Sequence, residues 1–174
     1  MKSTSRAEFF QQIGVAAVSS VTLLPNAANA AKYGGFGAGS PEVVSPKDAI
    51  IDDEILASED VQKSIAKIKA YTGAVDEMIG ALVSDSQADI GPYLRKTLEI
   101  SQLRTDLNTY NTAFDEDTQR GTDRLIRVVL QDIAEVEIAN KQKAGVTRSQ
   151  IRLDNLNGKL GKLSKSLKEL LAFV

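Results

Sequence analysis

The sequence predicts an all-α protein, an up-down-up-down antiparallel four-helix bundle with a flexible N-terminal arm. Of its 174 residues 43% are hydrophobic but only 5% aromatic, which favours a helical bundle over a β-sandwich or barrel. From residue 58 onward, four long stretches carry apolar residues at helical spacing. The connections between them are short, so successive helices are expected to be antiparallel neighbours.

Residues 1–30 have the design of an export signal. A positive start is followed by an apolar run over 13–24 and by an A-x-A cleavage site just before Ala31. The run is too short for a membrane span and ends at Pro25. A buried N-terminal helix is the alternative. The first residues resemble a twin-arginine signal except that Ala7 replaces the second arginine, so the export route stays open.

Residues 31–57 are expected to form a Gly/Pro-rich arm. Four glycines within six positions prevent regular structure in its first part. Tyr33 and Phe36 are the large apolar groups of that part, and we expect them to be disordered or pinned by a partner. A serine–proline pair before Lys47 predicts a short helix that reaches about Leu56.

Two acidic triplets, at residues 52–54 and 115–117, are the candidates for binding a hard cation. Three adjacent carboxylates on a helix do not face a common point, and acidic residues favour helix N-termini. We therefore expect the first triplet to be a solvated turn and the second to cap a helix. The sequence predicts no metal ligand.

The folded domain is expected to span residues 58–174 and to begin with a helix over about 58–83. Ser58 is a residue type preferred at N-caps, and the acidic pair after it suits the positive end of a helix. The expected core residues of this helix are Val61, Ile65, Ile68, Thr72, Val75, Ile79 and Leu82.

The second helix is expected to begin near Gly91, because Pro92 suits a first turn, and to continue to about residue 113. The third is expected over about 118–143, with Gly121 weakening its first turns. The expected core residues of the second helix are Tyr93, Ile100, Leu103, Leu107, Tyr110 and Phe114, with Leu94 and Leu98 beside this face. Those of the third are Leu125, Ile126, Val129, Ile133, Val136 and Ala139.

The fourth helix is expected between Val146 and Val174, where leucines are spaced 3, 4, 3, 4, 3. Such a seam is typical of a helix packed on near-parallel neighbours. Thr147 and Gln150 have the spacing of a capping box, and Gly145 suits the end of the preceding helix. The seam consists of Leu153, Leu156, Leu160, Leu163, Leu167 and Leu170.

Between Lys141 and Val174, eight basic residues face two acidic ones, a formal charge of +6. Such a helix face is either simply solvated or a docking surface for an acidic partner. Under the docking hypothesis, the partner-binding residues are Arg148, Arg152, Lys159, Lys162 and Lys165, together with Tyr33 and Phe36 on the arm.

The residue types exclude several functions. The chain has no Cys and no His, so thiolate metal sites, imidazole ligands and the commonest general base are ruled out. The sequence contains no Gly-rich phosphate loop, no paired Glu-x-x-His set and no nucleophilic triad. Its basic face lacks the interleaved aromatic residues typical of nucleic-acid binding. We expect neither an enzyme nor a nucleic-acid-binding protein, and predict no catalytic residue.

The sequence P-Y-L at residues 92–94, followed by L-R-T-D-L-N at 103–108, resembles the W-P-Y-V … Y-L-R-x-D-L-N segment of PsbQ, the oxygen-evolving enhancer family of photosystem II. Gly91 stands where that family usually has tryptophan. The resemblance covers about residues 59–174. Because no cysteine follows the export signal, the resemblance is to the algal or diatom branch rather than to the lipid-anchored cyanobacterial one.

The resemblance implies a non-catalytic extrinsic subunit in the chloroplast thylakoid lumen, peripheral to the lumenal side of the membrane. Its partners would be the photosystem II core and the other extrinsic subunits. It would bind no cofactor directly but would help retain calcium and chloride at a manganese–calcium cluster held by other subunits. With 30 residues before Ala31, we expect a thylakoid-transfer signal in a partial precursor, or a plastid-entry signal that is missing.

Two other functions stay open. One is an exported helical bundle that carries or senses a small ligand, which predicts a polar cavity between the helices. The other is a structural secreted bundle with an unrelated partner.

Overall fold

The computed structural model describes residues 41–143 and 145–174, and the elements below belong to one compact unit, residues 42–174. The described part of the chain is helical and contains no strand, only an isolated bridge between Ile51 and Phe114. The predicted all-α class is therefore confirmed. The elements are a 3₁₀ turn η1 (Pro46–Asp48) and the helices α3 (Asp53–Leu56), α4 (Glu59–Ser84), α5 (Gly91–Thr97), α6 (Ile100–Asn111), α7 (Glu116–Asn140) and α8 (Gln150–Leu171).

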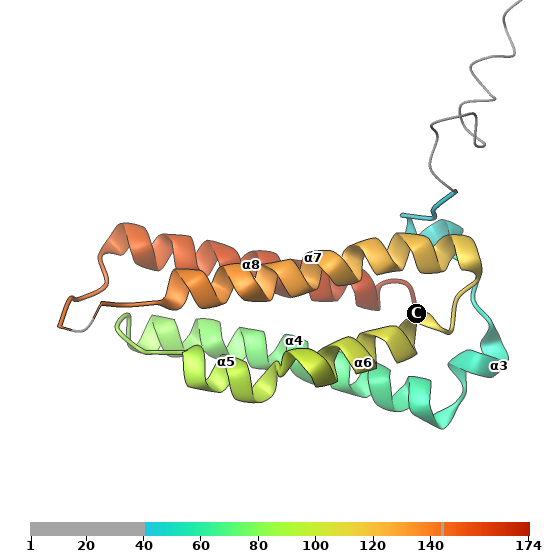
Figure 1. The fold of residues 1–174 in the computed structure, drawn as a ribbon, viewed down its shortest axis with the longest axis horizontal. Helices are drawn as coiled ribbons and strands as arrows, with labels where there is room; N and C mark the ends of the chain where they lie inside the picture. The colour runs from blue at the N-terminus through green and yellow to red at the C-terminus, as the bar shows by residue number, and fades with distance from the viewer. Residues whose placement is uncertain (1–40, 144) are drawn as a thin grey trace, which may run out of the picture. The chain divides into compact units, whose positions relative to one another are not determined.

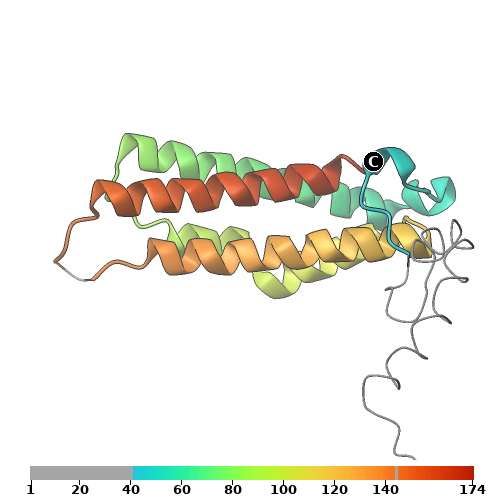
Figure 2. The ribbon, with the colours of Figure 1, turned by 90° about the horizontal axis from the view of Figure 1, so that it is seen from above.

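The long helices enclose a common core. α4 packs against α6 and α8, and α7 packs against the same two helices (Figures 1 and 2). α5 and α6 follow each other along one side, where α5 contacts both α4 and α7. Short connections reverse the chain direction after α4, after α6 and after α7.

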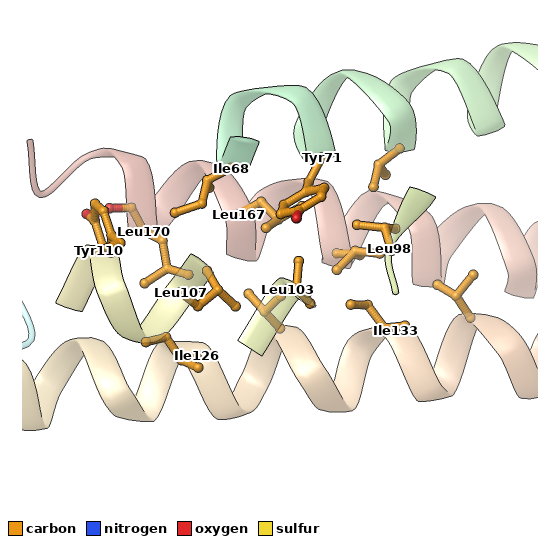
Figure 3. Packing of buried hydrophobic residues seen from close by; sticks show 14 of the residues in the cluster. Ile68, Tyr71, Leu98, Leu103, Leu107, Tyr110, Ile126, Ile133, Leu167 and Leu170 are labelled. Carbon is orange, nitrogen blue, oxygen red and sulfur yellow. The ribbon is translucent and has the colours of Figure 1, made fainter. Parts of the chain in front are cut away.

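Apolar side chains fill the space between these helices. In Figure 3, side chains from α4, α6, α7 and α8 point toward one another, with Leu103, Leu107 and Leu167 among them. Most of the expected core is buried, which confirms the helical periodicities of the sequence. The expected core residues that are only partly buried are Ile79, Leu125, Ala139 and Leu153.

The second predicted helix is interrupted, and the prediction of one continuous helix is wrong. The chain leaves the helical conformation at Leu98, where φ is −109° and ψ is 51°. Glu99 then caps α6, because its carboxylate accepts hydrogen bonds from the backbone of the first turn at 2.7 and 3.0 Å. The break changes which side faces inward. Leu94 and Leu98 are buried, whereas Tyr93 and Ile100 are exposed, in contrast to the sequence prediction.

The ends of α7 and α8 also differ from the predictions. α7 stops at Asn140, and Gly145, with φ of +75°, lies within the following loop rather than directly after the helix. α8 starts at Gln150 with Ser149 as its N-cap residue. The predicted capping box at Thr147 is therefore wrong, because Thr147 lies two residues before the cap position.

The segment before α3 crosses the start of α7 and is called the strap here (residues 42–52). Val43 N donates to Asp117 O at 3.0 Å, and Ile50 N donates to the Thr118 hydroxyl at 3.2 Å. The expected single short helix up to Leu56 is instead divided into η1 and α3. The hydrogen bonds that join residues 50–52 to Thr118 and to the connection between α6 and α7 account for the difference, since they hold the backbone between η1 and α3 extended.

Gly121 makes this crossing possible. A Cβ atom at this position would lie 1.7 Å from the carbonyl oxygen of Val43, which no side chain tolerates. The sequence suggested only a weakened helix at this glycine, whereas the structure shows that the strap passes directly over it.

Candidate functional site

Three predicted partner-binding residues, Lys159, Lys162 and Lys165, occupy every third position of α8. Lys159 Nζ lies 2.7 Å from Glu135 Oε2, and Lys162 Nζ lies 2.8 Å from Asp132 Oδ1. Both carboxylates belong to α7. The prediction that Lys159 and Lys162 carry unpaired positive charge is therefore wrong. It counted the charges of the α8 segment alone and left out the acidic residues of α7.

Asp132 is the buried centre of this cluster, with a side chain that is fully shielded from solvent. Its Oδ2 atom accepts a hydrogen bond from Ser166 Oγ at 2.7 Å. The hydrogen bond with Asp132 raises the pKa of Lys162, and the hydrogen bond from Lys159 lowers the pKa of Glu135. Because a buried carboxylate needs such partners, this cluster holds α7 against α8.

Lys165 differs from the other two lysines. Its side chain is 76% exposed, and it faces Glu169 of the same helix at 3.6 Å. An exposed pair of this kind contributes little to stability and is easily exchanged for another partner. Lys165 is thus free to meet an acidic surface.

Arg148 is buried, and its predicted exposure to a partner is wrong. Its guanidinium donates to the carbonyl oxygens of Ser86 and Ala88 and to Asn140 Oδ1 at distances of 2.7–3.2 Å. Its backbone N–H donates to Gln87 Oε1 at 2.6 Å. Burial lowers the pKa of this guanidinium. Arg148 therefore ties the loop after α4 to the segment that leads into α8.

Arg152 is exposed, as predicted, and donates a hydrogen bond to the carbonyl oxygen of Lys141. Lys141 and Lys143 are exposed as well. Within the described residues, none of these three cations forms an ion pair with a carboxylate. Among the eight basic residues from Lys141 onward, the exposed ones without a carboxylate partner in the described chain therefore lie in the α7–α8 connection and the first turn of α8.

Asp106, which belongs to the L-R-T-D-L-N segment, is a buried structural residue. It is 4% exposed and accepts hydrogen bonds from Lys67 at 2.8 Å, Tyr71 at 2.5 Å and Gln102 at 2.9 Å. Burial by itself raises the pKa of Asp106, but the three hydrogen bonds together lower it. The signal in the sequence was its place in the L-R-T-D-L-N segment, three residues after one buried leucine and just before another, on the inner side of α6.

A polar hollow of about 250 Å³ lies between the start of α5 and the end of α7. Asn140 Nδ2 donates to Asp89 Oδ1 at 2.6 Å, which lowers the pKa of Asp89, and Arg95 pairs with Glu137 at 3.2 Å. Asp89, Arg95 and Glu137 in the lining thus have polar partners, whereas Lys141, which also lines the hollow, has no carboxylate partner among the described residues. The hollow identifies no particular ligand.

The acidic triplets act as helix caps. Asp52 accepts hydrogen bonds from the backbone of Glu54 and Ile55 at 3.0 Å, and Asp115 accepts one from Thr118 N at 3.1 Å. The capping role of the second triplet is confirmed, and the first also caps a helix. Over residues 41–143 and 145–174, no three acidic side chains gather as ligands for a metal ion.

Tyr33, Phe36 and the predicted export signal lie outside the described residues. In the part of the chain that the structure describes, no helix is long and apolar enough to span a bilayer. Comparison of the chain with protein-family models, curated proteins and solved structures finds no match.

Proposed function

We propose that residues 58–174 form an up-down-up-down antiparallel four-helix bundle in which α5 and α6 together take the place of the second helix. The packing of α4 and α7 against both α6 and α8 supports this arrangement. So do the short connections, which favour antiparallel neighbours. The two residues between α5 and α6 then change which side chains of this second element face the core. They do not add a fifth element to the bundle.

On this fold we propose a non-catalytic extrinsic subunit of photosystem II, similar to PsbQ, on the lumenal face of the thylakoid membrane. The observation that carries the proposal is the motif over residues 92–108. Its apolar members Leu94, Leu103 and Leu107 are buried, and its Asp106 is a buried hydrogen-bond centre. Buried residues of this kind determine how α5 and α6 pack against the rest of the bundle. The resemblance therefore supports a shared bundle and, through it, a shared role.

Docking in this proposal is electrostatic and relies on exposed cations, of which Lys165 has only an exposed pair with Glu169 on its own helix and the others form no ion pair among the described residues. The bundle supplies Lys141, Lys143, Arg152 and Lys165, and the arm supplies Tyr33 and Phe36. Such binding is weakened by salt, since exposed charges are screened. The subunit binds no cofactor directly. It helps retain calcium and chloride by covering a manganese–calcium cluster that other subunits hold.

A salt wash tests this proposal. Oxygen-evolving photosystem II particles from the source organism are washed at about 1 M salt, where the Debye length falls to about 3 Å. We expect mass spectrometry to find the chain in the supernatant, beginning at Ala31. Its absence from both washed and unwashed particles, with the chain abundant in the cell, would contradict the proposal and leave the carrier or an unrelated bundle.

A further inference from the structure

The connection between α7 and α8 forms a basic, apolar tip, defined here as residues 141–143 and 145–152. From residue 138 to residue 153 the sequence contains four basic residues and no acidic one. Three of the four, Lys141, Lys143 and Arg152, are exposed and have no carboxylate partner among the described residues. The positive charge of this tip is therefore uncompensated within the bundle.

Two aliphatic side chains stand beside these cations. Val146 is 51% exposed and Ile151 is 82% exposed. Both lie within a few residues of a basic side chain, Val146 after Lys143 and Ile151 next to Arg152. Aliphatic groups flanked by long cationic side chains suit the boundary between lipid headgroups and acyl chains, where the cations stay at headgroup level.

The tip has a fixed base. Arg148 anchors its second part to the carbonyl oxygens of the loop after α4, and Gln87 bridges to the backbone of Arg148 at 2.6 and 3.2 Å. Figures 1 and 2 show the connection projecting past the neighbouring helix ends, away from the end where the C-terminus lies. The exposed groups thus lie along a connection whose base is fixed, with Ile151 and Arg152 in the first turn of α8.

We propose that this tip docks the protein on an anionic membrane surface. A stable protein interface uses roughly 20–30 residues on each side, which a projecting loop of this size does not supply. A bilayer requires less, since basic residues near an anionic surface each strengthen binding about five-fold and aliphatic groups add to this. The inference does not depend on the proposed photosystem role, because it rests on the exposure and charge of the tip alone.

A site-specific fluorescent probe tests the proposal in the full chain. Because the chain has no cysteine, Val146→Cys gives a single labelling site for an environment-sensitive dye. Ile50→Cys, on the exposed strap, is the matched control site. We expect a blue shift at residue 146 with vesicles that contain about one third phosphatidylglycerol, no shift with phosphatidylcholine alone, and no shift at residue 50.

Charge reversal supplies the second test. Lys141→Glu with Lys143→Glu, in the Val146→Cys background, is expected to weaken vesicle binding by at least about 25-fold. Lys69→Glu with Lys96→Glu makes the same change in net charge at exposed helix positions and is expected to leave binding unchanged.

Several results would overturn the proposal. These are no shift at residue 146, an equal shift with neutral vesicles or at residue 50, and equal effects of the two charge-reversed pairs. A shift that grows with protein concentration in the absence of vesicles would assign the tip to self-association. A shift produced only by an acidic protein partner would assign it to that partner.

Discussion

At the scale of single residues, the carboxylates that matter most are buried ones. Asp106 and Asp132 each lie inside the bundle, pair with a lysine and accept a hydrogen bond from a hydroxyl. In both cases the lysine is half-exposed while the carboxylate is not. A buried carboxylate without its partners is strongly unfavourable, so these residues make the packing of specific helices mutually dependent.

Replacing Asp106 tests its structural role. Asp106→Asn keeps the shape of the side chain but removes the negative charge to which Lys67 and Tyr71 donate hydrogen bonds. We therefore expect a loss of about 2–3 kcal/mol in the free energy of unfolding. Urea unfolding followed by circular dichroism measures it. Asp123→Asn is the matched control, since Asp123 forms an exposed pair with Arg127 and should change stability by less than about 0.5 kcal/mol. Equal effects of the two changes would contradict the assignment.

The lowered pKa of Asp106 predicts a dependence of stability on pH. Its stabilising effect is fully present above the unfolded value of about 3.9 and is lost as the pH falls through the lower, folded value. Unfolding in urea at pH 7 and at pH 3 should therefore show less acid sensitivity in Asp106→Asn than in the unmodified chain. A variant that loses as much stability in acid as the unmodified chain would show that other carboxylates control this range.

At the scale of elements, the contact between the strap and α7 depends on one glycine. The strap donates its backbone N–H groups to α7 across a distance that leaves no room for a side chain at Gly121. α8 also contains glycines, but a Cβ atom at Gly158 would meet nothing within 4 Å. Replacing a helical glycine is therefore expected to have opposite effects on stability at these two positions.

An alanine at each position separates these effects. Gly121→Ala is expected to displace the strap and lower the free energy of unfolding by about 1–3 kcal/mol, because the backbone of Val43 must move. Hydrogen exchange of residues 42–52 should become faster. Gly158→Ala is the control and should raise stability by up to about 1 kcal/mol. Unchanged exchange in Gly121→Ala would mean that the strap does not cross this position in solution.

At the scale of the whole molecule, the charges of α8 divide into two classes. Lys159 and Lys162 are engaged by α7, whereas Lys165 meets only a neighbour on its own helix. The tip adds further cations that lack acidic partners among the described residues. Binding to an acidic surface and stability of the bundle should therefore respond to different lysines.

Two single charge reversals test this division. Lys162→Glu places a carboxylate beside the buried Asp132, so we expect the melting temperature to fall by several degrees. Lys165→Glu should leave the melting temperature nearly unchanged and reduce rebinding to salt-washed photosystem II particles. Thermal melting by circular dichroism and a pull-down with the particles measure the two effects. A large loss of stability in Lys165→Glu would contradict this division of roles.

Much of the fold could be predicted from the sequence because helical periodicity is a local property. The leucines of α8 and the apolar stripes of α4 and α7 lie where their spacing placed them. The second helix could not be predicted as well. Its apolar residues fit a continuous helix, and the competing signal, a side-chain cap from Glu99 in the middle of the stretch, is weak in a single sequence.

The sequence by itself determined the helical class, the main core residues and the chemistry that the missing Cys and His exclude. Only the tertiary structure decided which charges are free. The guanidinium of Arg148 is hydrogen-bonded to carbonyl oxygens about 60 residues earlier in the chain, and Lys162 is paired with an aspartate on the preceding helix. Burial and neutralisation arise from contacts between distant segments, so a charge count along one helix could not separate a structural cation from an exposed one.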